Sequence, residues 1–513
     1  MSGLRWPKWV LYSGVGTAML PVLVLGLGKA MGQFTQGILF LQLLILCAAG
    51  IVAVGVAANG KNFYFTPLLL TMLYVVSYPL RALDMELNPD LFASSYATGL
   101  FSFTADDYWH FIAVSSIGIA GIGIGIVAMR HLLHLVKVRP AAVSPVVTSR
   151  LRTWIWVWFS ASLMMGLLAM QFQIGALTLE PIHLPFKLTG FIALTRPYLP
   201  TWTGLWLFGL AVRQGDRRAA WQILIMIVIL GVVAGLATLG KGAMVSSLLP
   251  FILYLTIMAS KSAITKSFQK WFILLVVLLL PVSIITASWL RVYTVRFGER
   301  PSFATLLQTY DVGSMFEDTG LTQFLFLHSF RRFSGANETM AVASGEPLDS
   351  LQKHFVLVLS LPGWQEVQSE SIHNVFQFND YESRAGGFGP VTGKAYGLFG
   401  LGYLTHNWFI LLLITAFASA MSLLIEGVFN RFGSLALNAG ISFMACMLIW
   451  EGAVDQVQGL VFSLLLMYTG LYLLSQLRKA PRESSKVRCV KQTASAVASA
   501  EQRLTELSRT RPN

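Results

Sequence analysis

Apolar runs long enough to cross a bilayer as helices dominate the chain. Two of the first are GTAMLPVLVLGLG and GILFLQLLILCAAGIVAVGVAA. A helix needs about 20 predominantly apolar residues to span roughly 30 Å of hydrocarbon. Runs of this kind predict about twelve transmembrane helices, near residues 12–28, 37–57, 63–80, 108–129, 153–173, 199–212, 219–238, 242–259, 271–290, 401–425, 435–450 and 459–476.

The composition supports the same interpretation. Of the 513 residues, 55% are hydrophobic and only 12% are charged, whereas charged residues make up about 25% of a typical soluble domain. We therefore predict an all-α polytopic membrane protein. It divides into a nine-helix membrane region with short loops (1–290), a large, partly helical loop (291–402), three C-terminal membrane helices (403–476) and a basic cytoplasmic tail expected to be disordered (477–513).

The basic residues predict the orientation in the membrane. With the N-terminus inside, 24 of the 37 Lys and Arg fall in cytoplasmic segments, and 8 of the remaining 13 lie in the 291–402 loop. Short cytoplasmic loops attract Lys and Arg, whereas long translocated loops are largely exempt from that rule. Both termini are therefore expected in the cytoplasm and the large loop on the opposite side. The net charge of +13 then reflects topology rather than nucleic-acid binding.

Ionisable residues are almost missing from the predicted spans. Asp106, Asp107 and Glu426 are expected at helix ends, and Lys241 in the turn ATLGKGAM. Ion-coupled transporters place charged side chains within their spans, where each is costly unless it is paired or hydrated. The chemistry is therefore expected in the loops.

The 291–402 loop carries two groups of arginines. Arg291, Arg296 and Arg300 follow the ninth predicted span, and Arg331 and Arg332 form a pair in RRFSGANE. Guanidinium groups bind phosphate oxygens in a planar, bidentate pattern. Ion pairs with the loop's own carboxylates or with lipid headgroups are the alternative for any single arginine. For the cluster as a whole we favour phosphate binding.

A second polar region lies near the end of the loop, around the glycine-rich turn GGFGP. A general base needs an available lone pair near neutral pH, and this region offers three candidates: His373, Asp380 and Glu382. Arg384 and Lys394 add positive charge. The alternative for the glycines is a simple turn before the tenth span.

A third element is the segment 179–200, which reads as an interfacial helix. It carries Lys187 and Arg196, which are candidates to line a lipid-facing groove; a plain proline-anchored connection is the alternative. No metal site is predicted, because the histidines are scattered and Cys47, Cys446 and Cys489 are far apart in the sequence.

These stretches resemble the Wzy-type O-antigen and oligosaccharide repeat-unit polymerases. The similar stretches are RRFSGANE, GGFGPVTGKAYGLFGLG, LPFKLTGFIALTR and TLGKGAM, the last with Lys241 where an arginine is commoner. The resemblance implies a GT-C-like glycosyltransferase of the bacterial inner membrane with a periplasmic active site. It implies an inverting, metal-independent transfer of a glycan from undecaprenyl diphosphate to the incoming lipid-linked unit, without a cofactor.

The resemblance also implies roles for the candidate residues. The expected ligands of the diphosphates are Arg291, Arg296, Arg331 and Arg332, with Lys241, Arg384 or Lys394 stabilising the leaving group. His373, Asp380 or Glu382 would activate the acceptor. The expected partners are the undecaprenyl-diphosphate-linked oligosaccharide, membrane lipid and a chain-length regulator, and no nucleic acid. The alternatives are an O-antigen ligase, which transfers glycan to a lipid A core and is compatible with His373 and Asn374, and a lipid-linked oligosaccharide flippase or exporter.

Overall fold

The computed structural model describes most of the predicted helical core. The described residues are 64–78, 105–135, 145–176, 182–239, 241–259, 268–276, 339, 342–343, 345–359, 361–376, 396–452 and 454–476. The predicted spans at 12–28 and 37–57, most of the span at 271–290 and the tail 477–513 lie outside them.

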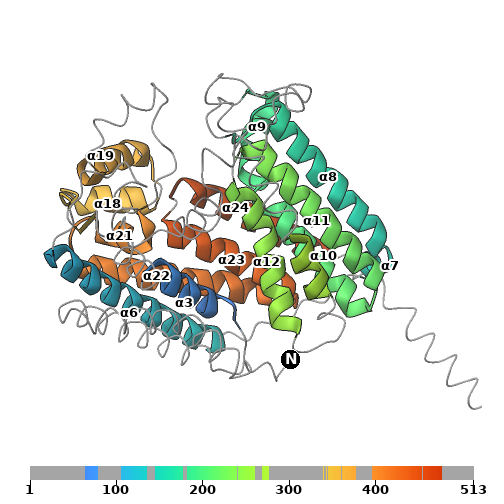
Figure 1. Cartoon of the computed structure of the whole chain (residues 1–513), viewed down its shortest axis with the longest axis horizontal. Helices are drawn as coiled ribbons and strands as arrows, with labels where there is room; N and C mark the ends of the chain where they lie inside the picture. Colours follow the sequence, from blue (N-terminus) through green and yellow to red (C-terminus); the bar gives the residue numbers. More distant parts are fainter. Residues whose placement is uncertain are drawn as a thin grey trace, which may run out of the picture.

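Within these residues the chain forms helices and short turns without a β-strand, which confirms the all-α class (Figure 1). Five stretches are long and apolar enough to cross a membrane: Ala113–Leu135, Leu151–Gln171, Arg217–Thr238, Trp408–Asn430 and Gln456–Gln476. The complete helices are α3 (Thr66–Ser77), α6 (Ala105–Leu135), α7 (Pro145–Ser149), α8 (Leu151–Gln171), α9 (Leu188–Thr195), α10 (Leu199–Gln214), α11 (Arg217–Thr238), α12 (Lys241–Ala259), α18 (Leu351–Val358), α19 (Trp364–Phe376), α21 (Gly397–Tyr403), α22 (Trp408–Asn430), α23 (Leu435–Glu451) and α24 (Val454–Gln476).

One predicted boundary is wrong. The span expected at 401–425 is two helices, because the chain breaks between α21 and α22. His406 adopts a left-handed φ of 53°, and the Asn407 side chain accepts hydrogen bonds from the backbone N–H groups of Phe409 and Ile410. This is an N-cap, which starts a new helix. The last residues of the predicted loop, from Gly397, are therefore helical and buried.

Helices α6 and α22 form the tightest pair in the described structure. A Cβ placed at Gly121 would overlap the Thr415 hydroxyl, and one at Gly125 would overlap the Ala416 carbonyl oxygen. The Ser419 hydroxyl donates to a carbonyl oxygen of α6 at 3.2 Å. Small residues allow such close approach in a bilayer, where burial of apolar side chains gives little drive for helix association. We call this contact the α6–α22 seam.

The seam also shows that the two helices are parallel. Gly121 lies beside Thr415, and about three turns further along both helices Leu133 lies beside Gly427. The predicted alternation requires the fourth and tenth spans to be parallel, since five spans, an odd number, lie between them.

Helix α3 is held to the seam by a buried carboxylate. Glu426 lies inside α22, one turn before its end, and not at the helix end that the sequence indicated. It is fully buried, and its two oxygens accept the backbone N–H groups of Phe65 at 2.6 Å and Thr66 at 2.9 Å. These N–H groups begin α3 and have no partner within their own helix. Glu426 thus caps a helix from the neighbouring one.

A second group of helices comprises α8, α10, α11 and α12 (Figure 1). Helices α8 and α11 are parallel, because Arg152 pairs with Asp216 at 3.3 Å near their starts and Gly166 lies against Val233 further along. The carboxylate of Asp216 accepts from the Ala219 N–H at 3.0 Å and caps α11. That backbone hydrogen bond is the main reason why the pKa of Asp216 lies below its usual value.

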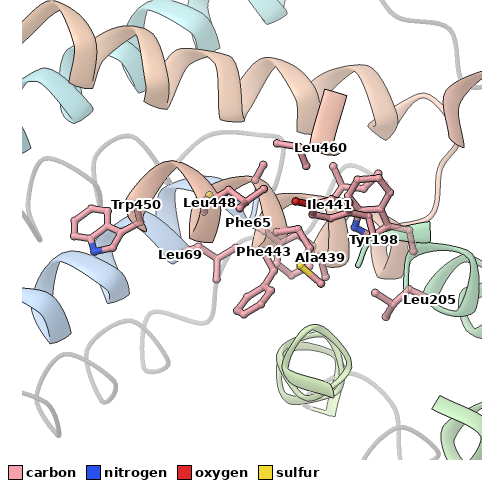
Figure 2. Close-up of a cluster of buried hydrophobic side chains, with 14 of the residues drawn as sticks. Phe65, Leu69, Tyr198, Leu205, Ala439, Ile441, Phe443, Leu448, Trp450 and Leu460 are labelled. Carbon is pink, nitrogen blue, oxygen red and sulfur yellow. The ribbon is translucent and has the colours of Figure 1, made fainter. Parts of the chain in front are cut away.

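Helix α23 joins the two groups. On one side α23 packs against Phe65 and Leu69 at the start of α3. On the other side it packs against Leu205 of α10 (Figure 2). On the α10 side, Gly209 lies against Ser434 and Gly440 against Leu205, so α10 and α23 are antiparallel. The buried apolar residues of both groups form one continuous core. The membrane region expected at 1–290 and the C-terminal helices expected from 403 therefore fold as one unit where they are described.

Candidate functional site

The turn between α23 and α24 is the point where the two helix groups meet at one end of the bundle. Gly452 ends α23 with a φ of 62°, and a Cβ added to it would lie 3.1 Å from the carbonyl oxygen of Gly397, the first residue of α21. On the other side, the Tyr198 hydroxyl donates to the Gln456 carbonyl oxygen at 3.4 Å. Helix α21 and the start of α10 thus flank the same turn. We call this the α9–α21 end of the bundle.

Part of the long loop docks at this end. The backbone N–H of Leu348 donates to the Leu404 carbonyl oxygen at 2.7 Å, and His406 Nε2 donates to the Val342 carbonyl oxygen at 2.8 Å. The Tyr78 hydroxyl, at the end of α3, is 3.0 Å from the Thr339 hydroxyl. The segment 339–376, where it is described, is therefore tied to α3 and α21, and Figure 1 shows α18, α19 and α21 grouped together.

His354 fixes α18 on α21 with its imidazole ring. Its Nε2 lies 2.6 Å from the Leu401 carbonyl oxygen, which can only accept, so Nε2 carries the proton. Its Nδ1 accepts from the Thr405 hydroxyl at 3.4 Å. Burial lowers the pKa of His354 below its usual value, although the hydrogen bond to Leu401 acts in the opposite direction. The ring is therefore a neutral structural contact.

Tyr396 performs the same task for α19. Its hydroxyl contacts the Ser371 hydroxyl and donates to the Gln368 carbonyl oxygen at 3.3 Å. Burial raises its pKa, so the phenol stays protonated at physiological pH. Helices α18 and α19 are thus held by His354 and Tyr396, two titratable side chains that remain uncharged.

Below the docked segment the bundle is filled with aromatic rings. The Tyr78 ring lies 4.6 Å from the Phe399 ring, 5.8 Å from the Phe111 ring and 5.8 Å from the Trp450 ring. The Trp450 indole N–H donates to the Ser77 hydroxyl at 2.9 Å. All four rings are buried. These rings form an apolar layer between α3, α6, α21 and α23 beneath the docked segment.

Two predicted groove residues lie on the other side of the α23–α24 turn, near α9. Lys187 is exposed. Arg196 is half-buried, and its guanidinium donates to the Ile174 carbonyl oxygen at 3.1 Å and lies over Gly175. The Arg196 guanidinium therefore stabilises the turn that follows α8 through one hydrogen bond. The position of Arg196 in the sequence did not indicate this structural role.

For two of the remaining candidate residues the structure describes only the backbone, and the others lie outside the described residues. Lys241 is the first residue of α12, and His373 lies in α19. The others lie outside the described residues: Asp380, Glu382, Arg291, Arg296, Arg300, Arg331, Arg332, Arg384 and Lys394. The structure thus places the backbone of one of the three candidate bases in the docked segment.

Glu451 is a further carboxylate at this end, and no motif in the sequence indicates it. It is the last residue of α23, is half-buried and precedes the turn at Gly452. The available signal was the predicted topology, which puts the short segment after the eleventh span on the same side as the long loop. In the described part of the chain, no three His, Cys, Asp or Glu side chains gather as metal ligands would.

Comparisons of the chain with protein-family models, with characterised proteins and with solved structures gave no match.

Proposed function

We propose that the protein is a membrane glycosyltransferase with a GT-C-like fold that polymerises oligosaccharide repeat units carried on undecaprenyl diphosphate. The observation that carries this proposal is the docking of a loop segment beside the α23–α24 turn, at the same end of the bundle as α9. Donor and acceptor are both lipid-linked, so their diphosphates must meet at one membrane surface. A polar cap next to lipid-facing helices suits that requirement.

The opposite end of the bundle supports the orientation within this proposal. The α10–α11 turn carries Arg213, Arg217 and Arg218, and Arg152 pairs with Asp216 there. Short loops rich in Lys and Arg remain in the cytoplasm. The α9–α21 end then faces the periplasm of a bacterium whose inner membrane holds the chain.

The proposed reaction is an inverting displacement. The acceptor hydroxyl oxygen forms a bond to the anomeric carbon of the donor glycan while the bond from that carbon to the diphosphate oxygen breaks. The hydroxyl proton passes to His373, Asp380 or Glu382, with Glu451 as a further carboxylate at this end. Arg291, Arg296, Arg300, Arg331 and Arg332 with Lys241, Arg384 and Lys394 stabilise the charge that grows on the diphosphate, as preorganised donors do where charge develops.

Turnover of a lipid-linked repeat unit by the purified protein tests the proposal. We expect a ladder of longer lipid-linked glycans in vesicles that contain the undecaprenyl-diphosphate-linked unit. Transfer to an added lipid A core without a ladder would identify a ligase, and movement of the unit across the bilayer without new bonds would identify a flippase. Either result overturns the polymerase.

Substitutions test the residue assignments. Arg291→Ala and Arg331→Ala should each abolish the ladder, because each removes a fixed positive charge from the proposed diphosphate site. Arg152→Ala is the matched control, because Arg152 is an exposed arginine whose partner Asp216 lies at the opposite end. It should leave the ladder unchanged. Retained turnover in Arg331→Ala removes that arginine from the site.

A further inference from the structure

The segment before α9 makes a sharp bend in a conformation that its residues disfavour. Phe186 and Lys187 are consecutive, and both have a left-handed φ of 56°. This conformation is unfavourable for residues with a Cβ atom. The bend is braced by the Thr189 hydroxyl, which accepts the Leu184 N–H at 2.7 Å. We call residues 182–191 the elbow. Backbone strain that the surrounding structure maintains suggests a functional position.

The elbow carries apolar side chains to the surface. Phe186, at its apex, is 100% exposed, and Ile182, Leu188 and Phe191 are 51%, 40% and 43% exposed. A surface of this kind requires a partner in which apolar groups are favoured.

Contacts with a spanning helix indicate the environment of this surface. The Phe191 ring packs edge-on against the Phe462 ring of α24 at 6.2 Å, and the Ser463 hydroxyl donates to the Leu194 carbonyl oxygen at 2.9 Å. Leu465, one turn along α24, is 61% exposed. The apolar face of the elbow is therefore continuous with an exposed apolar side of the spanning helix α24.

Lys187 adds a positive charge at the apex. Within the part of the chain that the structure describes, no carboxylate pairs with it. An exposed ammonium group next to an exposed aromatic ring fits a ligand that joins a hydrocarbon chain to a phosphate. Helix α9, into which the elbow leads, lies beside the start of α24, and α21, which holds the docked loop segment, lies on the other side of the α23–α24 turn.

We infer that the elbow is the docking site of the lipid-linked substrate, with the polyprenyl chain against Phe186 and Phe191 and the diphosphate on Lys187. This inference rests on the proposed function for the identity of the lipid. A phospholipid shares the chemistry of a chain and a phosphate. The diphosphate carries more negative charge than a phosphodiester, and a lysine that has no carboxylate partner among the described residues discriminates in its favour.

Site-specific photocrosslinking tests the inference. A benzophenone amino acid replaces Phe186 in one protein and the lipid-facing Leu465 in a control. Both are reconstituted in phosphatidylethanolamine and phosphatidylglycerol vesicles that contain a minor fraction of undecaprenyl diphosphate. We expect the ratio of polyprenyl to phospholipid adducts at position 186 to exceed that at position 465 several-fold. Adding Lys187→Ala should lower the ratio at 186 to that at 465, whereas adding Lys353→Ala should not.

Equal ratios at the two positions would overturn the inference, because the elbow would then only touch the bilayer. An absence of lipid adducts at position 186 would overturn it as well. The readout needs no turnover, so it separates the two proposals. A selective adduct in a protein that forms no glycan ladder would refute the polymerase and keep the elbow as a polyprenyl diphosphate site. A normal ladder with equal ratios would refute the elbow alone.

Discussion

The α6–α22 seam and the docked loop segment join neighbouring elements by different means. In the seam, glycines bring one helix against the backbone of the other, and the Ser419 hydroxyl reaches a carbonyl oxygen of α6. In the docked segment, imidazole rings reach carbonyl oxygens: His354 to Leu401 and His406 to Val342. The first region is suited to lipid, where close approach replaces hydrophobic burial. The second is suited to a boundary with water, because its contacts are made by polar side chains.

The largest expected effect comes from filling the seam. The leucine side chain in Gly125→Leu would overlap the Ala416 carbonyl and the Ser419 hydroxyl. Because the Ala416 carbonyl is part of the backbone, the overlap is relieved only if α22 moves away from α6. We expect a loss of more than about 3 kcal/mol of stability, beyond the usual range for overpacking. Thermal unfolding of the detergent-solubilised protein measures it.

Gly470→Leu is the matched control for the seam. Gly470 also lies in a spanning helix, but a Cβ there meets nothing within 4 Å. We expect its unfolding temperature to stay near that of the wild type. Equal losses in the two variants would mean that the seam is no tighter than the lipid-facing surface.

The next largest effect comes from the Glu426 cap. Glu426→Ala leaves the buried N–H groups of Phe65 and Thr66 without their acceptor, and we expect it to cost about 2–3 kcal/mol. Glu426→Gln keeps one acceptor oxygen and should cost roughly half of that. Unfolding temperatures compare the two. A Gln variant as unstable as the Ala variant would show that the charge matters more than the hydrogen bonds.

These two predictions concern contacts that the sequence did not reveal. Glu426 meets Phe65 from 361 positions away, and no pattern of spacing links the two residues. The spans themselves were predictable, because apolar length fixes them: 153–173 was expected and α8 covers Leu151–Gln171, and 219–238 was expected and α11 covers Arg217–Thr238.

The break at His406 shows why one boundary was missed. The apolar sequence continues from GLFGLGYL into WFILLLI with only Thr405, His406 and Asn407 between them, and hydropathy reads across such a short interruption. The roles of the candidate site residues stay predictions. Lys187 is exposed, whereas the hydrogen bond from Arg196 to the Ile174 carbonyl oxygen depends on a turn from another segment, which spacing in the sequence does not reveal.

A smaller, pH-dependent effect is expected in the docked segment. Burial lowers the pKa of His354 in the folded protein, so the unfolded state binds the proton more readily. The stability that neutral His354 provides is present above the unfolded value of about 6.5 and decreases as the pH falls below it. We expect amide hydrogen-exchange protection in α18, corrected for the intrinsic rate, to decrease over this range while protection in α22 does not.

His354→Gln tests the cause of that effect. Its side-chain amide can still donate to the Leu401 carbonyl oxygen but does not titrate. The variant should keep α18 docked and abolish the dependence on pH below 6.5. If wild type and variant lose protection in parallel, another group in the segment governs the response.

The smallest effect is expected where the docked segment faces solvent. The Lys353 ammonium lies 2.7 Å from a Glu370 oxygen and 3.1 Å from an Asp349 oxygen, and these hydrogen bonds raise its pKa. Exposed pairs of this kind are screened by salt and contribute little. Lys353→Met should therefore leave the unfolding temperature unchanged at moderate salt, with a small loss only at low salt. A loss comparable to that of Glu426→Ala would mean that charge pairs, and not the imidazole contacts, hold α18 and α19 together, and the contrast between the two regions would need to be redrawn.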